Sequence, residues 1–261
     1  MREEDVLKKT KIDLNSDLGE GFGIWKAGDG QDHEILELIS SANIATGFHA
    51  GDPMIMDETV RLAKKSGTGI GAHPGFRDLV GFGRRKINAT KDELINDIVY
   101  QVGALEAMAR RYDLPLQHVK PHGALYMAIS SEPDLAEVFV KSVKKIFPEA
   151  YIFCMDISET FKVAKDLGQP VIREFYADRD YDDSGSLVFT RGMGRLDPQK
   201  IANKVLTACL EGKVETTTGH WNAIEFESIC IHSDTPGVVE LLQAIHQSLA
   251  SANIQITNQF H

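Results

Sequence analysis

Short apolar runs alternate along the chain with longer segments whose apolar residues recur every three or four positions. The seven apolar runs cover residues 11–15, 42–48, 69–73, 116–122, 150–155, 170–175 and 228–232. Between them, positions such as Leu94, Ile98 and Val102 have the spacing of a helix that buries one face. Strands that alternate with helices predict a parallel sheet with right-handed crossover connections.

Capping signals place the ends of several helices. A helix start is marked by Asp-Pro, by Thr-Pro, or by a threonine with a glutamate three residues later. A helix end is marked by glycine. The predicted helix starts are Asp52-Pro53, Thr90 with Glu93, Asp197-Pro198 and Thr235-Pro236, and the predicted ends are Gly67 and Gly212.

Polar residues stand at the carboxyl ends of nearly all the predicted strands. They are Asn15, Asp17, His49, Asp52, His73, Lys120, His122, Glu174, Asp178, Arg179, His232 and Asp234. In an open parallel sheet, ligands gather at one switch point, whereas a closed barrel brings every carboxyl end around one mouth. We therefore predict an α/β fold, a seven-stranded parallel β/α barrel of the TIM type, with one domain over residues 1–261.

Composition excludes several classes of protein. With 43% hydrophobic and 25% charged residues, the chain has the composition of a globular protein. A net charge of −10 and a pI near 5.4 argue against a nucleic-acid-binding surface. Residues 1–11 are charged and lack the apolar core of a secretory signal, and no run of 18 apolar residues occurs. We expect a cytoplasmic protein with no membrane partner, whose three cysteines (Cys154, Cys209 and Cys230) are reduced core thiols.

Glycine or proline neighbours three of the strand-end histidines, in "HAGDP", "HPGF" and "PHGAL". These residues allow tight turns and a close approach of the backbone to a ligand. The loop "DLVGFGRR" (78–85) ends in Arg84 and Arg85, and guanidinium groups on such a rim suit a carboxylate or a phosphate.

The residue types at the mouth permit two kinds of chemistry. Asp17, His49 and His73 are a plausible set of ligands for a divalent metal that activates water. The same groups can instead act as acid and base without a metal, with Lys120 and an arginine stabilising negative charge. Zincin, serine hydrolase and P-loop motifs are absent from the sequence. These observations leave both kinds open.

Some of these residues also have structural interpretations. For Asp52 and Asp234, which stand just before a helix-starting proline, the structural alternative is that each is a helix cap and nothing more. For Glu174 and Arg179 it is a surface ion pair. Five other histidines lack the strand-end context and are interpreted as structural or surface residues: His33, His118, His220, His246 and His261.

Six motifs in one order, from about Lys11 to Leu249, resemble the LamB/YcsF family, described as the A subunit of the prokaryotic 5-oxoprolinase. They are "IDLNSDLGEGFG", "SANIATGFHAGDP", "GAHPGFRDLVGFGRR", "HVKPHGALY", "REFYADRDY" and "ICIHSDTP". The resemblance implies a distorted seven-stranded β/α barrel like that of polysaccharide deacetylases. It also implies opening of the 5-oxo-L-proline lactam to L-glutamate with ATP and Mg²⁺, performed together with subunits B and C.

The motifs carry a pocket onto this sequence, within which we assign roles by chemistry. The catalytic candidates are Asp17, His49, His73, Lys120, His122 and Glu174. The substrate-binding candidates are Asn15, Asp52, Arg84, Arg85, Asp178, Arg179 and His232.

The sequence departs from the family pattern at Thr46, where cysteine is common, at Ser233, where glycine is common, and over residues 189–200. No phosphate-cradling loop is recognisable, so the question of which protein of the complex binds ATP stays open. Two alternatives also stay open: a metal-dependent amide or N-acetyl hydrolase that acts alone, and a non-catalytic subunit that binds a small molecule.

Overall fold

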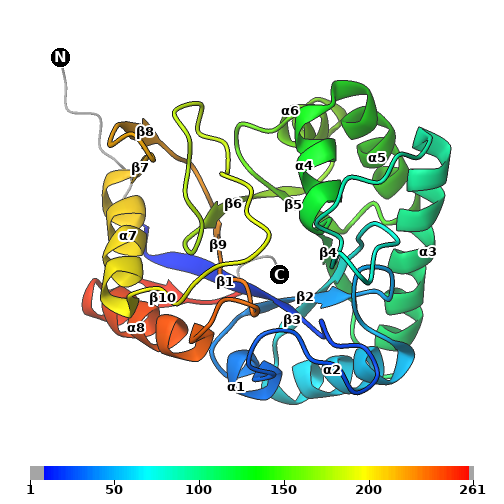
Figure 1. Cartoon of the computed structure of the whole chain (residues 1–261), viewed down its shortest axis with the longest axis horizontal. Helices are drawn as coiled ribbons and strands as arrows, with labels where there is room; N and C mark the ends of the chain where they lie inside the picture. Colours follow the sequence, from blue (N-terminus) through cyan, green and yellow to red (C-terminus); the bar gives the residue numbers. More distant parts are fainter. Residues whose placement is uncertain (1–8, 259–261) are drawn as a thin grey trace.

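Seven parallel strands close into a barrel within residues 9–258, the part of the chain that the computed structural model describes (Figure 1). The barrel strands are β1 (Lys11–Leu18), β2 (Ser41–Ala45), β3 (Gly69–His73), β4 (Leu116–Val119), β5 (Tyr151–Cys154), β6 (Val171–Tyr176) and β9 (Ser228–Cys230). Each strand pairs with the next in that order, and β1 pairs with both β2 and β9, which closes the barrel. The predicted fold is confirmed.

Helices surround the barrel (Figure 1). They are α1 (Asp32–Leu36), α2 (Pro53–Ser66), α3 (Lys91–Arg110), α4 (Gly123–Ser131), α5 (Pro133–Ile146), α6 (Glu159–Leu167), α7 (Pro198–Glu211) and α8 (Val238–Ser251). Among the described residues, three short strands lie outside the barrel: β7 (Lys213–Glu215) and β8 (Trp221–Ala223) form an antiparallel pair, and β10 (Gln255–Ile256) pairs with β1. No helix in the described part of the chain is both long enough and apolar enough to span a membrane.

Three of the predicted helix starts are confirmed, and the fourth is wrong. Asp52 and Asp197 cap α2 and α7, and Thr90 forms a capping box with Glu93 at the start of α3. The last helix, α8, begins at Val238 after Gly237, which has a φ of 78°. Thr235 does not cap it, because the Thr235 hydroxyl donates a hydrogen bond to Asp178 at the barrel mouth instead.

The barrel interior is polar at both ends. At the amino end, the carboxylate of Asp13 on β1 accepts hydrogen bonds from the hydroxyls of Ser40, Ser41 and Ser228. Burial raises the pKa of Asp13 to about 6, although these three hydroxyls act in the opposite direction. Asp13 therefore ties together β1, β2 and β9 on the side of the barrel away from the strand ends that carry the candidate site.

The three cysteines lie in the protein interior. Cys154, Cys209 and Cys230 are free and buried, as the sequence predicts. His261, which we interpret as structural or surface, lies outside the described residues.

Candidate active site

The carboxyl ends of the strands converge on one set of buried polar side chains. Asp17 comes from β1, His73 from the end of β3 and Glu174 from β6, while Lys120 and His122 follow β4. These five side chains are nearly inaccessible to solvent. Because parallel strands present all their carboxyl ends at the same mouth, residues more than a hundred positions apart come into contact there.

A buried lysine lies between two carboxylates at this mouth. Lys120 Nζ is 2.9 Å from Glu174 Oε1 and 3.5 Å from Asp17 Oδ1, and it donates to Asn15 Oδ1 at 3.2 Å. Burial alone would lower the pKa of Lys120, but the charges of Asp17 and Glu174 raise it well above its usual value. Lys120 is therefore a permanent cation at neutral pH.

The two carboxylates are held in place by further hydrogen bonds. Asn43 donates to Asp17 Oδ1 at 2.8 Å, and the Tyr176 hydroxyl donates to Glu174 Oε2 at 2.8 Å. Burial would raise the pKa of Asp17, but His73 and Lys120 outweigh it and hold that pKa well below its ordinary value. Asp17 is accordingly ionised beside the lysine.

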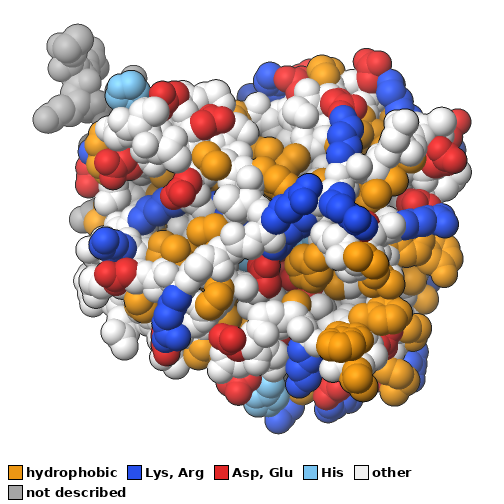
Figure 2. Space-filling model, viewed as in Figure 1, with side chains coloured by type: hydrophobic (Ala, Val, Ile, Leu, Met, Phe, Trp, Pro, Cys, Tyr) orange, Lys and Arg blue, Asp and Glu red, His pale blue; other side chains and the backbone are white. Residues whose placement is uncertain are grey.

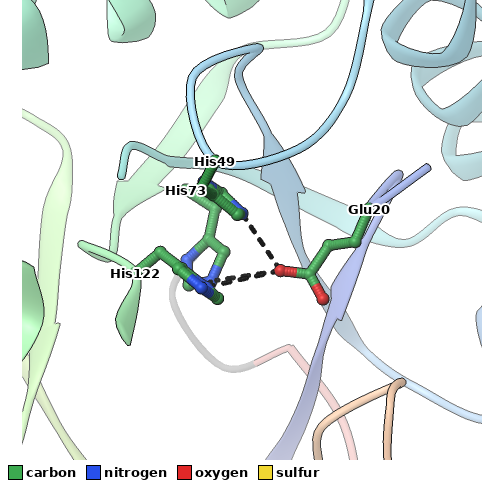
Figure 3. Close-up of side chains that lie close together, drawn as sticks. All are labelled: Glu20, His49, His73 and His122. Atoms are coloured by element: carbon green, nitrogen blue, oxygen red, sulfur yellow. Dashed lines mark hydrogen bonds and ion pairs between the residues drawn. The ribbon is translucent and has the colours of Figure 1, made fainter. Parts of the chain in front are cut away.

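Three histidines and one glutamate form a second group beside the lysine, with their polar atoms facing one another (Figure 3). Glu20 Oε1 is 3.1 Å from His49 Nε2, 3.3 Å from His122 Nδ1 and 3.9 Å from His73 Nε2. Burial lowers the pKa of both His49 and His122 well below the usual value, so both rings are neutral. Burial, followed by the charge of Asp17, raises the pKa of Glu20.

Two of the three metal ligands predicted from the sequence belong to this group of four residues. His49 and His73 belong to the group of four, whereas Asp17 lies beside it, with Oδ2 3.4 Å from His73 Nε2. Glu20 is not among the residues predicted from the sequence. It stands two residues beyond β1 in the motif "IDLNSDLGEGFG", which is the available signal for it.

Two glycines let the histidine rings pack this closely. A Cβ on Gly75 would come within 2.5 Å of His49 Nδ1, and one on Gly83 would come within 2.8 Å of His122 Cδ2. Gly75 lies in "HPGF", where we expect glycine to permit close backbone approach, and Gly83 lies in the glycine-rich loop 78–85. In the structure they approach the candidate catalytic rings.

His232 lies at the edge of the mouth and is bound to an aspartate. His232 Nδ1 is 3.0 Å from Asp178 Oδ1, and its Nε2 is 3.8 Å from Asp17 Oδ2. Asp178 also pairs with Arg179 Nη1 at 2.8 Å. Burial would raise the pKa of Asp178, but His232 and Arg179 overcome this and lower it. The charged Asp178 thus orients both the histidine and the arginine.

The comparisons with known proteins agree with this arrangement of motifs. A sequence model described as the LamB/YcsF family matches residues 12–261. The chain belongs to the LamB/YcsF family. It is 58% identical over 247 residues to the first of the 5-oxoprolinase A subunits of Pseudomonas aeruginosa, a match that covers 95% of this chain and 98% of that protein. It is 44% identical to the 5-oxoprolinase A subunit of Clostridium beijerinckii, with 94% and 96% of the two chains covered.

A solved structure from the same comparisons has the same architecture. The "Lactam Utilization Protein" of Thermus thermophilus superposes with a TM-score of 0.86 at 38% sequence identity, over 95% of this chain and 99% of that one. The superposition shows that the two chains share their overall fold.

The LamB/YcsF motifs also bring a cluster of arginines to the mouth. Arg84 Nη1 is 2.7 Å from Asp234 Oδ2, and Arg179 Nη2 is 3.7 Å from the other oxygen of Asp234. Arg84 also donates to the carbonyl of Arg191 at 2.7 Å, within the stretch 189–200 where the sequence departs from the family pattern. That stretch therefore contacts the site directly.

Two of the predicted substrate-binding residues point away from the site. Asp52 accepts hydrogen bonds from the backbone N–H groups of Met54, Ile55 and Gly23, and so caps α2, which was the structural alternative. Arg85 is half-exposed and pairs with Asp78 within its own loop. The Asp52 carboxylate is used at the start of α2, and the Arg85 guanidinium is turned toward Asp78. Neither residue is therefore placed to bind a ligand at the barrel mouth.

A cavity opens beside Lys120, and a cleft lies on the other side of the histidines. The cavity lining combines the charged groups with aromatic and apolar side chains: Asp17, His73, Arg84, Lys120, His122, Tyr126, Tyr176, Arg179, Phe189 and His232. Glu20 and His49 line the separate cleft together with Phe22, Trp25 and Val80. Ile24, Trp25 and Val80 are strongly exposed, and hydrophobic side chains gather on the α2 side of the face shown in Figure 2.

Proposed function

We propose that this chain is the A subunit of an ATP-dependent 5-oxoprolinase, which opens the lactam of 5-oxo-L-proline to give L-glutamate while ATP becomes ADP and phosphate. The observation that carries the proposal is the buried ion-pair system of Lys120, Asp17 and Glu174 at the mouth of a barrel that belongs to the LamB/YcsF family. The relatives named as 5-oxoprolinase A subunits cover nearly the whole chain and support it.

The chemistry of the lactam explains why such a site would be needed. A five-membered lactam is a stabilised amide, and transfer of the ATP γ-phosphoryl group to its oxygen makes the ring carbon open to attack by water. Negative charge then accumulates on that oxygen and on the phosphoryl group, where a fixed cation is effective. Lys120 is such a cation, since it is buried and permanently charged.

The substrate carboxylate and the protons fall to other residues of the cavity. Arg84 and Arg179, which share Asp234, are the groups that we propose bind the carboxylate of 5-oxoproline. His232, oriented by Asp178, is suited to transfer a proton to the ring nitrogen as it leaves. Asn15 positions Lys120 and Glu174 through its amide group.

Partner subunits B and C are part of the proposal. The relatives are named as one subunit of 5-oxoprolinase, and this sequence has no recognisable phosphate-cradling loop. Exposed apolar side chains at a cleft are typical of surfaces that contact another protein, and Phe22, Trp25 and Val80 provide them. ATP, with Mg²⁺, is therefore proposed to be bound with the help of a partner.

Growth on 5-oxoproline tests the proposal in cells. A strain of Pseudomonas aeruginosa that lacks the genes for its own A subunits should fail to use 5-oxoproline as nitrogen source, and expression of this chain should restore growth because the match to the host protein is 58% identical. A Lys120→Met variant, checked by immunoblot for equal amounts of protein, should not restore growth. If the host protein restores growth and this chain at equal abundance does not, the proposed function is wrong.

A further inference from the structure

The hydrogen bonds behind His73 and His122 fix where these rings carry their protons. His73 Nδ1 is 2.7 Å from the backbone carbonyl of Lys120, and His122 Nε2 is 2.8 Å from the backbone carbonyl of Phe82. A carbonyl oxygen only accepts, so each of these nitrogens must donate. In a neutral ring the other nitrogen then has a lone pair, which is His73 Nε2 in one case and His122 Nδ1 in the other.

These two lone pairs face each other. His73 Nε2 and His122 Nδ1 are 2.9 Å apart, which is hydrogen-bond distance, yet neither neutral ring has a proton to place between them. Glu20 Oε1 adds a carboxylate oxygen 3.3 Å from His122 Nδ1. A cation bound between these electron pairs would remove their mutual repulsion in the buried site.

The backbone around Phe82 supports the same arrangement. Phe82 has a φ of 53°, a left-handed conformation that bulky residues rarely adopt. Its carbonyl is the group that accepts from His122 Nε2. Histidines that bind metals almost always donate their second N–H to a carbonyl or carboxylate in this way.

We propose that Glu20, His49, His73 and His122 bind one divalent transition-metal ion of the Zn²⁺ type. One ligand atom from each residue lies within 4.8 Å of the others. In a tetrahedral site with metal–ligand distances of about 2.0–2.1 Å, neighbouring ligand atoms are about 3.3 Å apart. The contacts of 2.9, 3.1, 3.3 and 3.9 Å surround that value.

The donor set selects the class of metal. Imidazole nitrogens suit Zn²⁺ and its first-row neighbours, whereas Mg²⁺ requires oxygen ligands in octahedral geometry. Three imidazoles and one carboxylate therefore define a site distinct from the Mg²⁺ that accompanies ATP. His49 presents its Nε2 to the group, 3.1 Å from Glu20 Oε1.

The alternative cation is a proton. A protonated His73 would donate toward His122 Nδ1 or toward Asp17 Oδ2, which is 3.4 Å away. A proton would relieve the contact between the two rings, and Glu20 would then accept a hydrogen bond from His49 Nε2, whereas a metal would bind all four polar atoms that face one point (Figure 3). The metal accounts for all four residues.

The site adjoins both openings at the barrel mouth. His73 and His122 line the cavity that contains Lys120, and Glu20 and His49 line the neighbouring cleft. When bound there, an ion of this class supplies a Lewis acid next to the cavity. Any such role in the reaction rests on the proposed function, whereas the binding of metal does not.

Metal content and stability test the inference without an activity assay. The purified full-length chain, stripped with a chelator and dialysed against Zn²⁺ or Co²⁺, should retain about one equivalent by elemental analysis, and Co²⁺ should give the visible absorption of a tetrahedral site. Added Zn²⁺ should raise the Tm, because it binds the folded state. Glu20→Gln and His122→Gln should each weaken Zn²⁺ binding at least about 100-fold and abolish the Tm shift.

A histidine outside the barrel provides the matched control. His246 on α8 bonds to the Leu38 carbonyl, and His246→Gln should bind Zn²⁺ like the unchanged chain. Circular dichroism of each variant without metal shows whether it folds, and His73→Gln replaces any variant that does not. Retention of no stoichiometric metal, or equal binding by the folded Glu20 and His122 variants, would overturn the inference in favour of a proton. Stoichiometric binding by a chain that opens no lactam in the presence of ATP and the partner subunits B and C would leave this site standing and refute the proposed function instead.

Discussion

Replacement of Lys120 with methionine is expected to lower the rate of glutamate release from 5-oxoproline by about 10³-fold, measured with the partner subunits and ATP present. Methionine is nearly as long as lysine and uncharged, so it retains the packing and removes the cation 2.9 Å from Glu174. The loss of one preorganised group that stabilises developing negative charge costs about 10²–10³-fold in rate. Lys120 also holds Glu174 and Asp17 in position, so we expect the loss of rate to lie at the upper end of this range.

The same substitution is expected to reduce stability, and a second change separates the two effects. Without Lys120, the carboxylates of Asp17 and Glu174 stay buried with no ammonium partner, which costs about 3–5 kcal/mol in the free energy of unfolding. In Lys120→Met with Glu174→Gln, one of the two charges is gone, so urea denaturation should show a partial return of stability while the rate stays low. Recovery of the rate together with stability would mean that Lys120 serves only charge balance.

Asp17→Asn should lower the rate by about 10²–10⁴-fold, the range found when a positioned acid or base is lost. The strand β1 supplies its own matched control. Asp13 is also fully buried, four residues earlier, but its carboxylate binds serine hydroxyls at the amino end of the barrel. Asp13→Asn should reduce stability and leave the rate per folded molecule unchanged. Equal loss of rate in both variants would assign Asp17 a structural role.

The two aspartates should also respond oppositely to pH. The pKa of Asp13 is about 6 in the fold against 3.8 in the unfolded chain, so the folded state holds the extra proton between these values. The contribution of Asp13 to stability is greatest below about pH 4 and falls by about 3 kcal/mol as the pH rises to about 6. The pKa of Asp17 is lowered, so its contribution is present above about pH 4 and is lost as the pH falls. Denaturation of Asp13→Asn and the unchanged chain between pH 4 and 7 should show this decline only in the latter.

The fold could be predicted because its signals are local and repeated. Each strand ends in polar residues, and the caps at Asp52, Thr90 and Asp197 act on neighbouring backbone N–H groups. The start of the last helix was misplaced because Thr235 has two competing hydrogen-bond uses, and the contact with Asp178, 57 residues away in sequence, prevails. That choice depends on tertiary structure. One domain over residues 1–261 stays a prediction.

The site could be predicted in its residue types but only partly in its members. Strand-end position identified Lys120, His73 and Glu174, since a barrel places strand ends together. Strand-end position overlooked Glu20, which lies beyond the end of β1 in a glycine-rich turn and contacts His49 from there. It also included Arg85, because sequence gives no direction for a side chain on a loop, and the ion pair with Asp78 decides that direction. The roles of the individual residues stay proposals.

Reconstitution in vitro tests the central claim most directly. The purified chain is mixed with the cognate B and C subunits, Mg²⁺, ATP and 5-oxo-L-proline, and glutamate and ADP are quantified, with each protein omitted in turn. We predict glutamate and ADP in equal amounts from the complete mixture, little glutamate when any one of the three proteins is left out, and little when the chain is the Lys120→Met variant. Undiminished glutamate formation by the B and C subunits without this chain would contradict the claim that the lactam is opened with its participation.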